Sequence, residues 1–96
     1  MVVHMVLFNF KEEIDIEKRQ EVLRDCRRVI PTLPGVKNLF VGKNIREDGE
    51  YEYALNMMFD SIEALDRYRV DPDHARFRDE ELYPYLKNVI GLDYEE

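Results

Sequence analysis

The 96 residues of this chain suffice for one domain and could not fill two hydrophobic cores, so we expect residues 1–96 to fold as a single unit. A content of 45% hydrophobic and 11% aromatic residues is typical of globular proteins and excludes an intrinsically disordered chain. The net charge of −7, from 14 basic and 21 acidic residues, argues against nucleic acid and anionic membrane surfaces as partners.

Cysteine usage and the start of the chain bear on where the protein works. The single cysteine, Cys26, excludes an internal disulfide and a multi-cysteine zinc site, and a lone thiol suits a reducing compartment. The apolar opening, residues 1–10, is too short to span a bilayer and lacks the basic leader of a signal peptide. We therefore expect a cytoplasmic protein with no membrane segment.

Residues 1–10 carry apolar side chains at both parities, which predicts a strand covered on both faces. One face of this strand holds Val2, His4, Val6, Phe8 and Phe10. Asp15 is then the N-cap candidate of a helix that should end at Pro31 and Pro34-Gly35. The apolar stripe of the helix consists of Val22, Cys26, Val29 or Ile30, and Leu33.

Two further strands are predicted on either side of a turn. Residues 36–45 form the first of them, and Asp48-Gly49 is a hairpin turn signal. The next strand begins near Tyr51 or Glu52 and ends at Phe59. Its core-facing side chains are Tyr51, Tyr53, Leu55, Met57 and Phe59.

The last third of the chain predicts two helices and a closing strand. Ser61 is the N-cap candidate of a short helix. The inner side of that helix carries Ile62, Leu65 and Tyr68. Asp71-Pro72 stops it and starts another, which contains His74 and ends near Pro84. The stretch 88–94 reads as the closing strand.

The order strand, helix, strand, strand, two helices, strand predicts an α+β, ferredoxin-like fold, the split βαβ arrangement with a four-stranded antiparallel sheet. Helices cover one face of such a sheet and leave the other bare. The bare face here would expose Met5, Leu7 and Met58, and an apolar face of this kind needs a partner. We expect that partner to be a second copy of the chain.

Short motifs run in a fixed order through nearly the whole chain. They are Val3-His4-Met5-Val6-Leu7-Phe8 with Phe10-Lys11, Leu33-Pro34-Gly35-Val36 leading to Gly42-Lys43-Asn44, Phe59-Asp60-Ser61 with Ala64-Leu65 and Tyr68, Pro72-Asp73-His74 with Phe77, and Asp93-Tyr94. In this order they resemble the stress-responsive A/B barrel domain family. The resemblance implies a homodimer, a dimeric α+β barrel in which two sheets pack through their open faces across a twofold axis.

The resemblance also implies a chemistry. Some members of the family are plant polyketide cyclases, which close a linear polyketide by an aldol step without cofactor or metal. In them a tyrosine and a histidine carry the reaction in a pocket between sheet and helices, and the matching positions are Tyr68 and His74. His4 matches their strand-one histidine. This chain departs from them at Tyr53, where they have a histidine, and at Cys26, where they have a tyrosine.

The residue types suit an aldol closure, which needs a base beside a carbonyl and a donor for the enolate oxygen. Imidazole titrates at about 6.5, and phenol, at about 10, remains a donor at neutral pH. We therefore predict His74 as the catalytic base and Tyr68 as the donor. The predicted lining of the substrate-binding cavity is His4, Phe8, Leu23, Cys26, Tyr53 and Leu55. Arg69 stands where the cyclases have an apolar wall residue, which argues against an alkyl-tailed polyketide.

His74, His4 and Cys26 each also have a purely structural interpretation. His74, which follows a helix start, could tie that turn to the sheet, and His4, inside an apolar strand, could be a hydrogen-bonded core histidine. Cys26 fits a small buried hydrophobe better than a nucleophile, because no histidine is placed to activate it and a buried thiol stays protonated.

Two acidic clusters offer the oxygen ligands that magnesium prefers. They are Asp71 and Asp73 with His74, and Asp93 with Glu95 and Glu96. Helix capping explains the first cluster and a solvated acidic tail explains the second, both without an ion. We therefore expect neither a metal nor a cofactor.

The leading functional hypothesis is a small-molecule binding protein or a cofactor-independent enzyme of the polyketide cyclase kind, with a small aromatic or polyketide-like ligand. The alternative is a non-enzymatic, stress-associated protein that acts as a stable homodimer or larger oligomer. A haem- or quinone-handling monooxygenase of the sister dimeric-barrel families shares the fold but finds no motif here. A cavity that reaches both His74 and Tyr68 favours the first hypothesis, and a filled interior favours the second.

Overall fold

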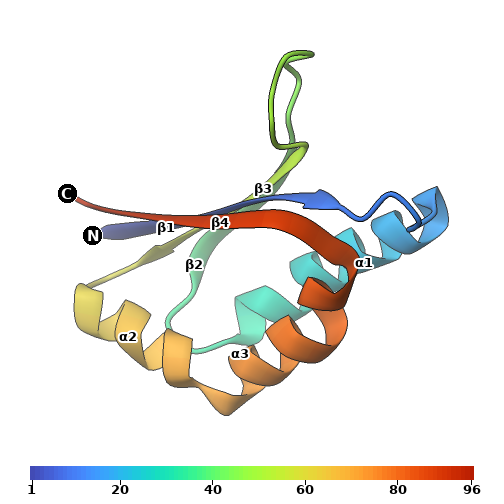
Figure 1. The fold of residues 1–96 in the computed structure, drawn as a ribbon. Helices are drawn as coiled ribbons and strands as arrows, with labels where there is room; N and C mark the ends of the chain where they lie inside the picture. The colour runs from blue at the N-terminus through green and yellow to red at the C-terminus, as the bar shows by residue number, and fades with distance from the viewer.

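The computed structural model describes residues 1–96 as one sheet with its helices on a single face (Figure 1). The main elements are β1 (Val2–Phe10), α1 (Ile16–Val29), β2 (Lys37–Lys43), β3 (Tyr53–Phe59), α2 (Ile62–Val70), α3 (Pro72–Arg76) and β4 (Leu86–Glu95). A 3₁₀ turn, Ile30–Thr32, follows α1. A π-helical stretch, Phe77–Leu82, and a 3₁₀ turn, Tyr83–Tyr85, continue α3.

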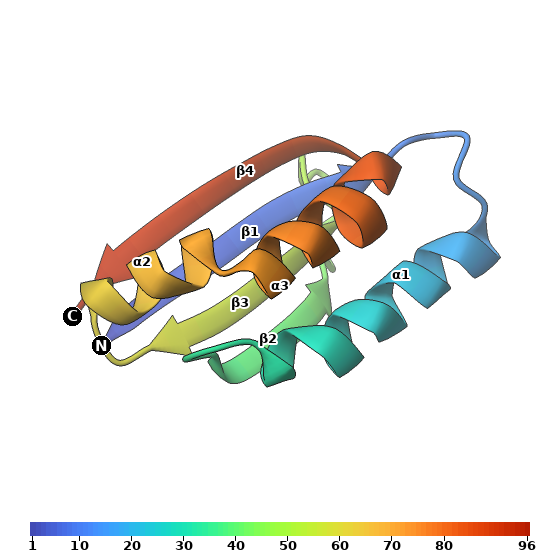
Figure 2. The same cartoon turned by 90° about the horizontal axis from the view of Figure 1, so that it is seen from below.

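The strand order is β2-β3-β1-β4, and each neighbouring pair is antiparallel. The predicted α+β, ferredoxin-like fold is therefore confirmed. Viewed from the helical side, α1 crosses one half of the sheet and α2 with α3 crosses the other (Figure 2). Because β1 is central, His4 lies between Met57 of β3 and Asp93 of β4.

The hydrophobic core lies between the sheet and the helices. The inward side chains of the two central strands are those that the alternation predicts, and Phe8, Leu55 and Phe59 among them are buried. From α1, Val22 and Cys26 pack onto this face. Val29, the last residue of α1, is only half-buried, and the predicted stripe continues beyond the helix with Ile30 and Leu33, which are buried.

Side-chain caps fix the start of each helix, and all of the predicted caps are confirmed. The carboxylate of Asp15 accepts the Lys18 N–H at 2.8 Å, the hydroxyl of Ser61 accepts the Ala64 N–H at 3.1 Å, and the carboxylate of Asp71 accepts the His74 N–H at 3.0 Å. The Asp71 backbone N–H also bonds the Tyr68 carbonyl, so one residue both ends α2 and starts α3.

β3 begins at Tyr53, and the earlier start predicted at Tyr51 or Glu52 is wrong. The buried side chain of Asn9 occupies the backbone groups there: its amide donates to the Glu50 carbonyl at 2.8 Å, and its oxygen accepts the Glu52 N–H at 2.7 Å. Backbone groups bonded to the Asn9 side chain are not available to β1, so the pairing of β1 with β3 ends at Phe8 and Tyr53. On the other side, the Glu52 carbonyl still accepts the Asn44 N–H at 2.7 Å.

The last helical turn includes Pro84 and ends at Tyr85. β4 begins at Leu86, two residues before the predicted start at residue 88. Pro84 does not end the helical segment because it lies in the first turn of a 3₁₀ helix, where its missing N–H has no helical partner to lose. β2 lies within its predicted range, residues 36–45.

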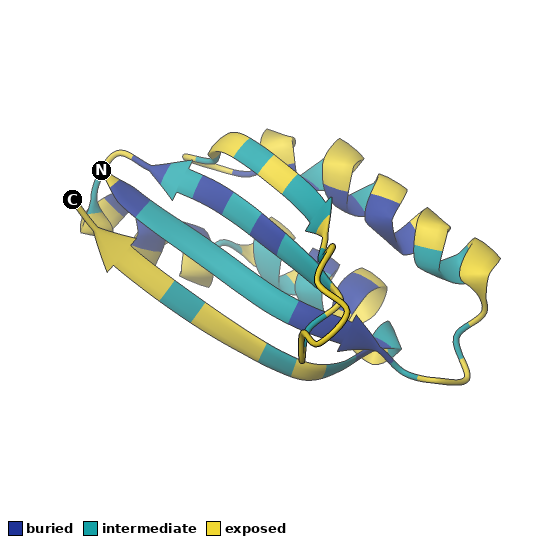
Figure 3. Ribbon diagram, turned by 90° about the horizontal axis from the view of Figure 1, so that it is seen from above, coloured by how far each residue is buried: buried dark blue, intermediate teal, exposed yellow.

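No helix covers the outer face of the sheet, as predicted (Figure 3). Met5, Leu7 and Met58 are half-buried there by their strand neighbours. Phe40 and Tyr94 on the same face are 63% and 58% exposed, so aromatic rings stand in solvent in the single chain. This is the face on which the sequence predicts a second copy.

Candidate functional site

A cavity of about 270 Å³ lies between the inner face of the sheet and the α2 and α3 side of the helical layer. Its apolar wall consists of Val6, Ile30, Leu55, Met57, Phe77, Leu82, Tyr83, Val89 and Gly91, and its polar groups belong to His4, Tyr68, Arg69, His74 and Arg78. An apolar pocket with a few convergent polar groups is the usual form of a small-molecule site, and typical pockets hold about 300 to 1,000 Å³. This cavity therefore suits a small ligand.

Tyr68 and His74 meet on the helical wall of the cavity. Tyr68 lies in the last turns of α2 and His74 lies in α3, and the break at Asp71-Pro72 turns the chain so that their rings face each other. The ring centroids are 4.0 Å apart with an interplanar angle of 31°. The structure thus brings together the two residues that the family resemblance singles out.

The His74 imidazole is half-buried, and its Nδ1 atom is buried without a hydrogen-bond partner. Burial lowers the pKa of this ring below its ordinary value, and the positive charge of Arg78 adds to that effect. The Arg69 backbone and, more weakly, the Asp71 carboxylate act against this lowering of the pKa, and His4 adds weakly to it. At neutral pH the ring is therefore unprotonated and can accept a proton.

The Tyr68 phenol is almost completely buried, with 3% of the residue exposed. Burial raises its pKa well above the ordinary value, and no hydrogen bond to the phenol contributes to the shift. The hydroxyl therefore keeps its proton at neutral pH. It is available as a hydrogen-bond donor to a ligand in the cavity.

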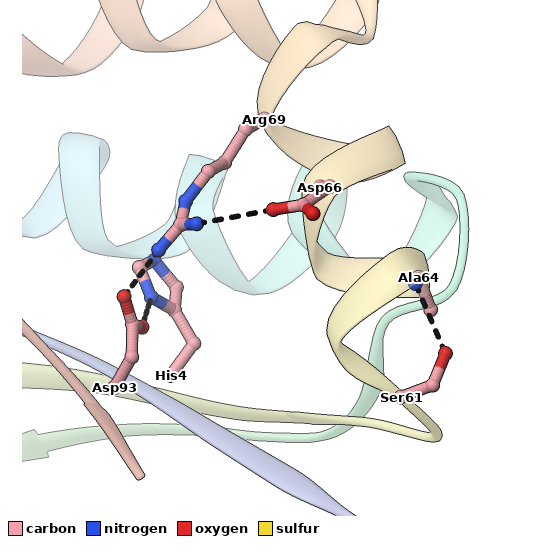
Figure 4. Close-up of polar contacts among 6 residues, drawn as sticks. All are labelled: His4, Ser61, Ala64, Asp66, Arg69 and Asp93. Carbon is pink, nitrogen blue, oxygen red and sulfur yellow. Dashed lines mark hydrogen bonds and ion pairs between the residues drawn. The ribbon is translucent and has the colours of Figure 1, made fainter. Parts of the chain in front are cut away.

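His4, Asp93 and Arg69 form a polar cluster (Figure 4), and two of them, His4 and Arg69, line the cavity. One carboxylate oxygen of Asp93 binds Nδ1 of His4, and the other binds Nη2 of Arg69. The second guanidinium amine, Nη1, binds Asp66 at 3.4 Å. Since Asp93 occupies Nδ1, the ring nitrogen that His4 can offer to a ligand is Nε2.

Four of the predicted lining residues do not line this cavity. They are Phe8, Leu23, Cys26 and Tyr53, whereas His4 and Leu55 do line it. Phe8 stacks on Tyr53 at 5.8 Å between ring centroids, so the two rings fill the space that a ligand would need. Burial raises the pKa of the Cys26 thiol to about 12, which keeps it protonated and unreactive.

Arg78 and Asp93 are site residues that the sequence interpretation did not single out for this cavity. Arg78 lies in the π-helical stretch, whose wider turn changes which side chains face inward, and a pattern with the α-helical period misses that change. Asp93 reaches His4 through the pairing of β4 with β1. The alternation of the two strands, with His4 already placed inward, was the signal that could have found it.

The structure bears on metal binding and on membrane insertion. It brings together no group of three or more histidine, cysteine or acidic side chains that could hold a metal ion. Asp71 caps α3 and Asp93 binds His4 and Arg69, so both have other partners. None of the helices combines the length and the apolar character that crossing a bilayer requires. The cytoplasmic location stays a prediction.

Known proteins similar to this chain match it over almost its whole length. A family model described as Dabb, Stress Responsive A/B Barrel Domain, matches residues 2–96. Olivetolic acid cyclase from Cannabis sativa is 27% identical over 98 residues, which cover 97% of this chain and 94% of the cyclase. A stress-response A/B barrel domain-containing protein from Arabidopsis thaliana is 26% identical over 96 residues, which cover 97% of this chain and 87% of that protein.

Solved structures match the fold equally well. A Dabb family protein with a ferredoxin-like fold from Mesorhizobium loti has a TM-score of 0.90 at 23% identity, covering 99% of this chain and 95% of that one. A protein from Thermobifida fusca has a TM-score of 0.83 at 19% identity, covering 99% and 90%, and is described as a dimeric ferredoxin-like protein of unknown function. Dimers are thus described among the neighbours of this fold.

Proposed function

Because the chain belongs to the stress-responsive A/B barrel domain family, we propose that its cavity binds a small molecule and performs a cofactor-independent, aldol-type reaction on it. The observation that carries this proposal is the pairing of Tyr68 with His74 at 4.0 Å on one cavity wall. One ring is a protonated donor and the other an unprotonated base, which is the division of roles that the reaction needs. The similarity to a protein named a cyclase supports the same reaction class.

In the proposed reaction, the unprotonated His74 ring removes a proton from the carbon next to a ligand carbonyl. The electron pair moves onto the carbonyl oxygen, and the enolate oxygen accepts a hydrogen bond from Tyr68. The enolate carbon attacks a second carbonyl of the same ligand and forms the carbon–carbon bond that closes the ring. Protonated His74 returns its proton to the new alkoxide, so the step consumes no oxidant, reductant or metal.

His4 and Asp93 have a supporting role in this proposal. Asp93 fixes the orientation of the His4 ring by binding Nδ1, which leaves Nε2 for a polar group of the ligand. Arg69 in turn holds the second oxygen of Asp93. We assign His4 to ligand orientation and Asp93 to the positioning of His4.

Proton exchange tests the chemistry without knowledge of the natural substrate. The probe is 4-acetylbenzoate, an aromatic ketone whose methyl protons exchange slowly with D₂O, and NMR follows the loss of the methyl signal. We expect the protein to accelerate exchange, and His74→Gln to lower the accelerated rate by about 100-fold or more, since general base catalysis contributes about 10² to 10⁴. Tyr68→Phe should lower it less.

Unchanged exchange in His74→Gln, with the melting temperature of the parent, would contradict the assignment of the base. Exchange that never rises above the rate in buffer would contradict the proposed reaction itself. Arg67→Gln is a suitable control, because Arg67 lies on α2 with an exposed side chain outside the cavity.

The bare sheet face favours a second candidate, a stress-associated protein whose role depends on a stable homodimer. The Asn56 side-chain oxygen lies on this face, buried without a hydrogen-bond partner, and Phe40 beside it is exposed. A second copy packed through the open sheet face would cover the exposed Phe40 ring. We expect sedimentation equilibrium to give a dimer at micromolar concentration and Leu7→Glu to give a monomer, and a parent monomer would contradict the dimer.

A further inference from the structure

The charged and ionisable groups that line the cavity are unlike those of the chain as a whole. The chain has 21 acidic and 14 basic residues, yet no acidic residue lines the cavity, and its two charged residues are Arg69 and Arg78. His4, Tyr68 and His74 add groups that can donate hydrogen bonds. A surface that is acidic overall thus contains a cavity whose fixed charges are positive, which favours an anionic ligand.

Arg69 and Arg78 differ in how many of their terminal guanidinium nitrogens bind a carboxylate of the protein. Both terminal amines of Arg69 bind carboxylates, those of Asp66 and Asp93. Arg78 binds only its sequence neighbour, Asp79, through Nε at 2.9 Å and Nη2 at 3.3 Å. Its Nη1 has no partner, so the two N–H donors on that nitrogen remain for a ligand.

Arg78 also lies beside the reacting pair, at a position that the backbone defines. In a π-helical stretch, residues five apart in the sequence lie on the same face. Phe77 and Leu82 have this spacing, as do Arg78 and Tyr83, and all four residues line the cavity. The Arg78 guanidinium lies 6.0 Å from the centre of the Tyr83 ring, which limits where it can move. His74, the base of that pair, lines the same cavity.

We propose that the ligand of this cavity carries a carboxylate and that Arg78 binds it, so that Arg78 determines specificity for small aromatic or keto acids over their neutral analogues. This inference rests on the proposed function for the ligand's location and extends it to the ligand's charge. Asp79, whose side chain is 59% exposed, competes with the ligand for the same guanidinium and is easily displaced into water. Arg69, held by two carboxylates, forms the wall and not the anion site.

A matched pair of probes tests the carboxylate without reference to turnover. 4-Acetylbenzoate and 4-acetylbenzamide have nearly the same shape and differ in charge, and titration calorimetry or NMR gives their dissociation constants. We expect the parent to bind the acid about tenfold more tightly than the amide, as one charge-assisted hydrogen bond suggests. Arg78→Gln should remove this preference, and the control Arg67→Gln should keep it.

A second variant changes the preference in the opposite direction. Asp79→Asn frees Nε and Nη2 of Arg78 and should strengthen the binding of the acid without strengthening that of the amide. Equal binding of the two probes by the parent, failure of the parent to bind the acid, or a preference that survives Arg78→Gln would overturn the inference. Arg78→Gln should retain the parent's melting temperature within a few degrees.

The two proposals fail in different ways. If the protein binds the acid more tightly than the amide, and this preference depends on Arg78, but proton exchange is not accelerated, then the anion site is supported and the proposed reaction is contradicted. If accelerated exchange depends on His74 but the acid and the amide bind equally tightly, then the proposed reaction is supported and the anion site is contradicted.

Discussion

The inner face of the sheet has two ends that are built differently. At one end Phe8, Phe10 and Tyr53 pack ring against ring, with centroids 5.4 to 5.8 Å apart, and leave no space. At the other end Tyr68 and His74 stand over the cavity. The same strands, β1 and β3, run through both ends. The difference shows that the core is completed by aromatic packing at one end, which leaves the other end free for polar groups.

The first prediction concerns the packed end and has the largest expected effect. Phe8→Ala removes a fully buried ring and leaves a cavity, which should lower the free energy of unfolding by about 3 to 5 kcal/mol. Tyr68→Phe at the open end removes only a hydroxyl that has no partner in the protein, so its effect should stay within about 1 kcal/mol. Urea denaturation measures both, and similar losses in the two variants would show that the ends do not differ.

The second prediction tests the polar cluster at the open end. Asp93→Asn removes the charge that binds both His4 and Arg69. We expect the free energy of unfolding to fall by about 1 to 2 kcal/mol, less than for a fully buried ion pair, because Asp93 is partly exposed. Asp48→Asn is the matched control: its pair with Arg46 is almost fully exposed, and its loss should be within about 0.5 kcal/mol. Equal losses would mean that the cluster contributes no more than a surface ion pair.

The third prediction is a smaller effect, on the pH dependence of stability. The pKa of His74 is lower in the folded protein than in the unfolded chain, so the unfolded chain binds its proton more readily. Stabilisation by the neutral ring is complete above the unfolded pKa of about 6.5 and is lost as the pH falls below it. Between pH 7 and pH 5 the parent should therefore lose more stability than His74→Gln, measured by urea denaturation at both pH values. Parallel losses would contradict the lowered pKa.

Much of the fold could be predicted because its signals are local. The alternation along residues 1–10 puts His4 on the inner face, and the caps at Asp15, Ser61 and Asp71 start the helices where the structure has them. The element boundaries that differ depend on distant contacts. The start of β3 is set by the side chain of Asn9, more than forty residues away in the chain.

The site was less accessible to sequence reasoning. The family resemblance predicts that Tyr68 and His74 share one site, whereas nothing in their spacing by itself predicts that the two rings are in contact. Cys26 and Tyr53 are predicted to line the cavity because they match two positions of the resembling cyclases, and Tyr53 also shares the inward face with Leu55. Tyr53 instead packs against Phe8 and Phe10, which the resemblance does not reveal. Arg78 was missed because a π-helical turn has no clear sequence signature.

The most direct test of the account is the NMR response of the two histidine rings to a ligand. The chain has only His4 and His74, and the His74→Gln variant assigns their ring signals. Addition of millimolar 4-acetylbenzoate should shift the signals of both rings while those of the Phe8 and Phe10 rings at the packed end stay unchanged. Histidine signals that do not move, or shifts of equal size at the two ends, would contradict a ligand site between His4, Tyr68 and His74.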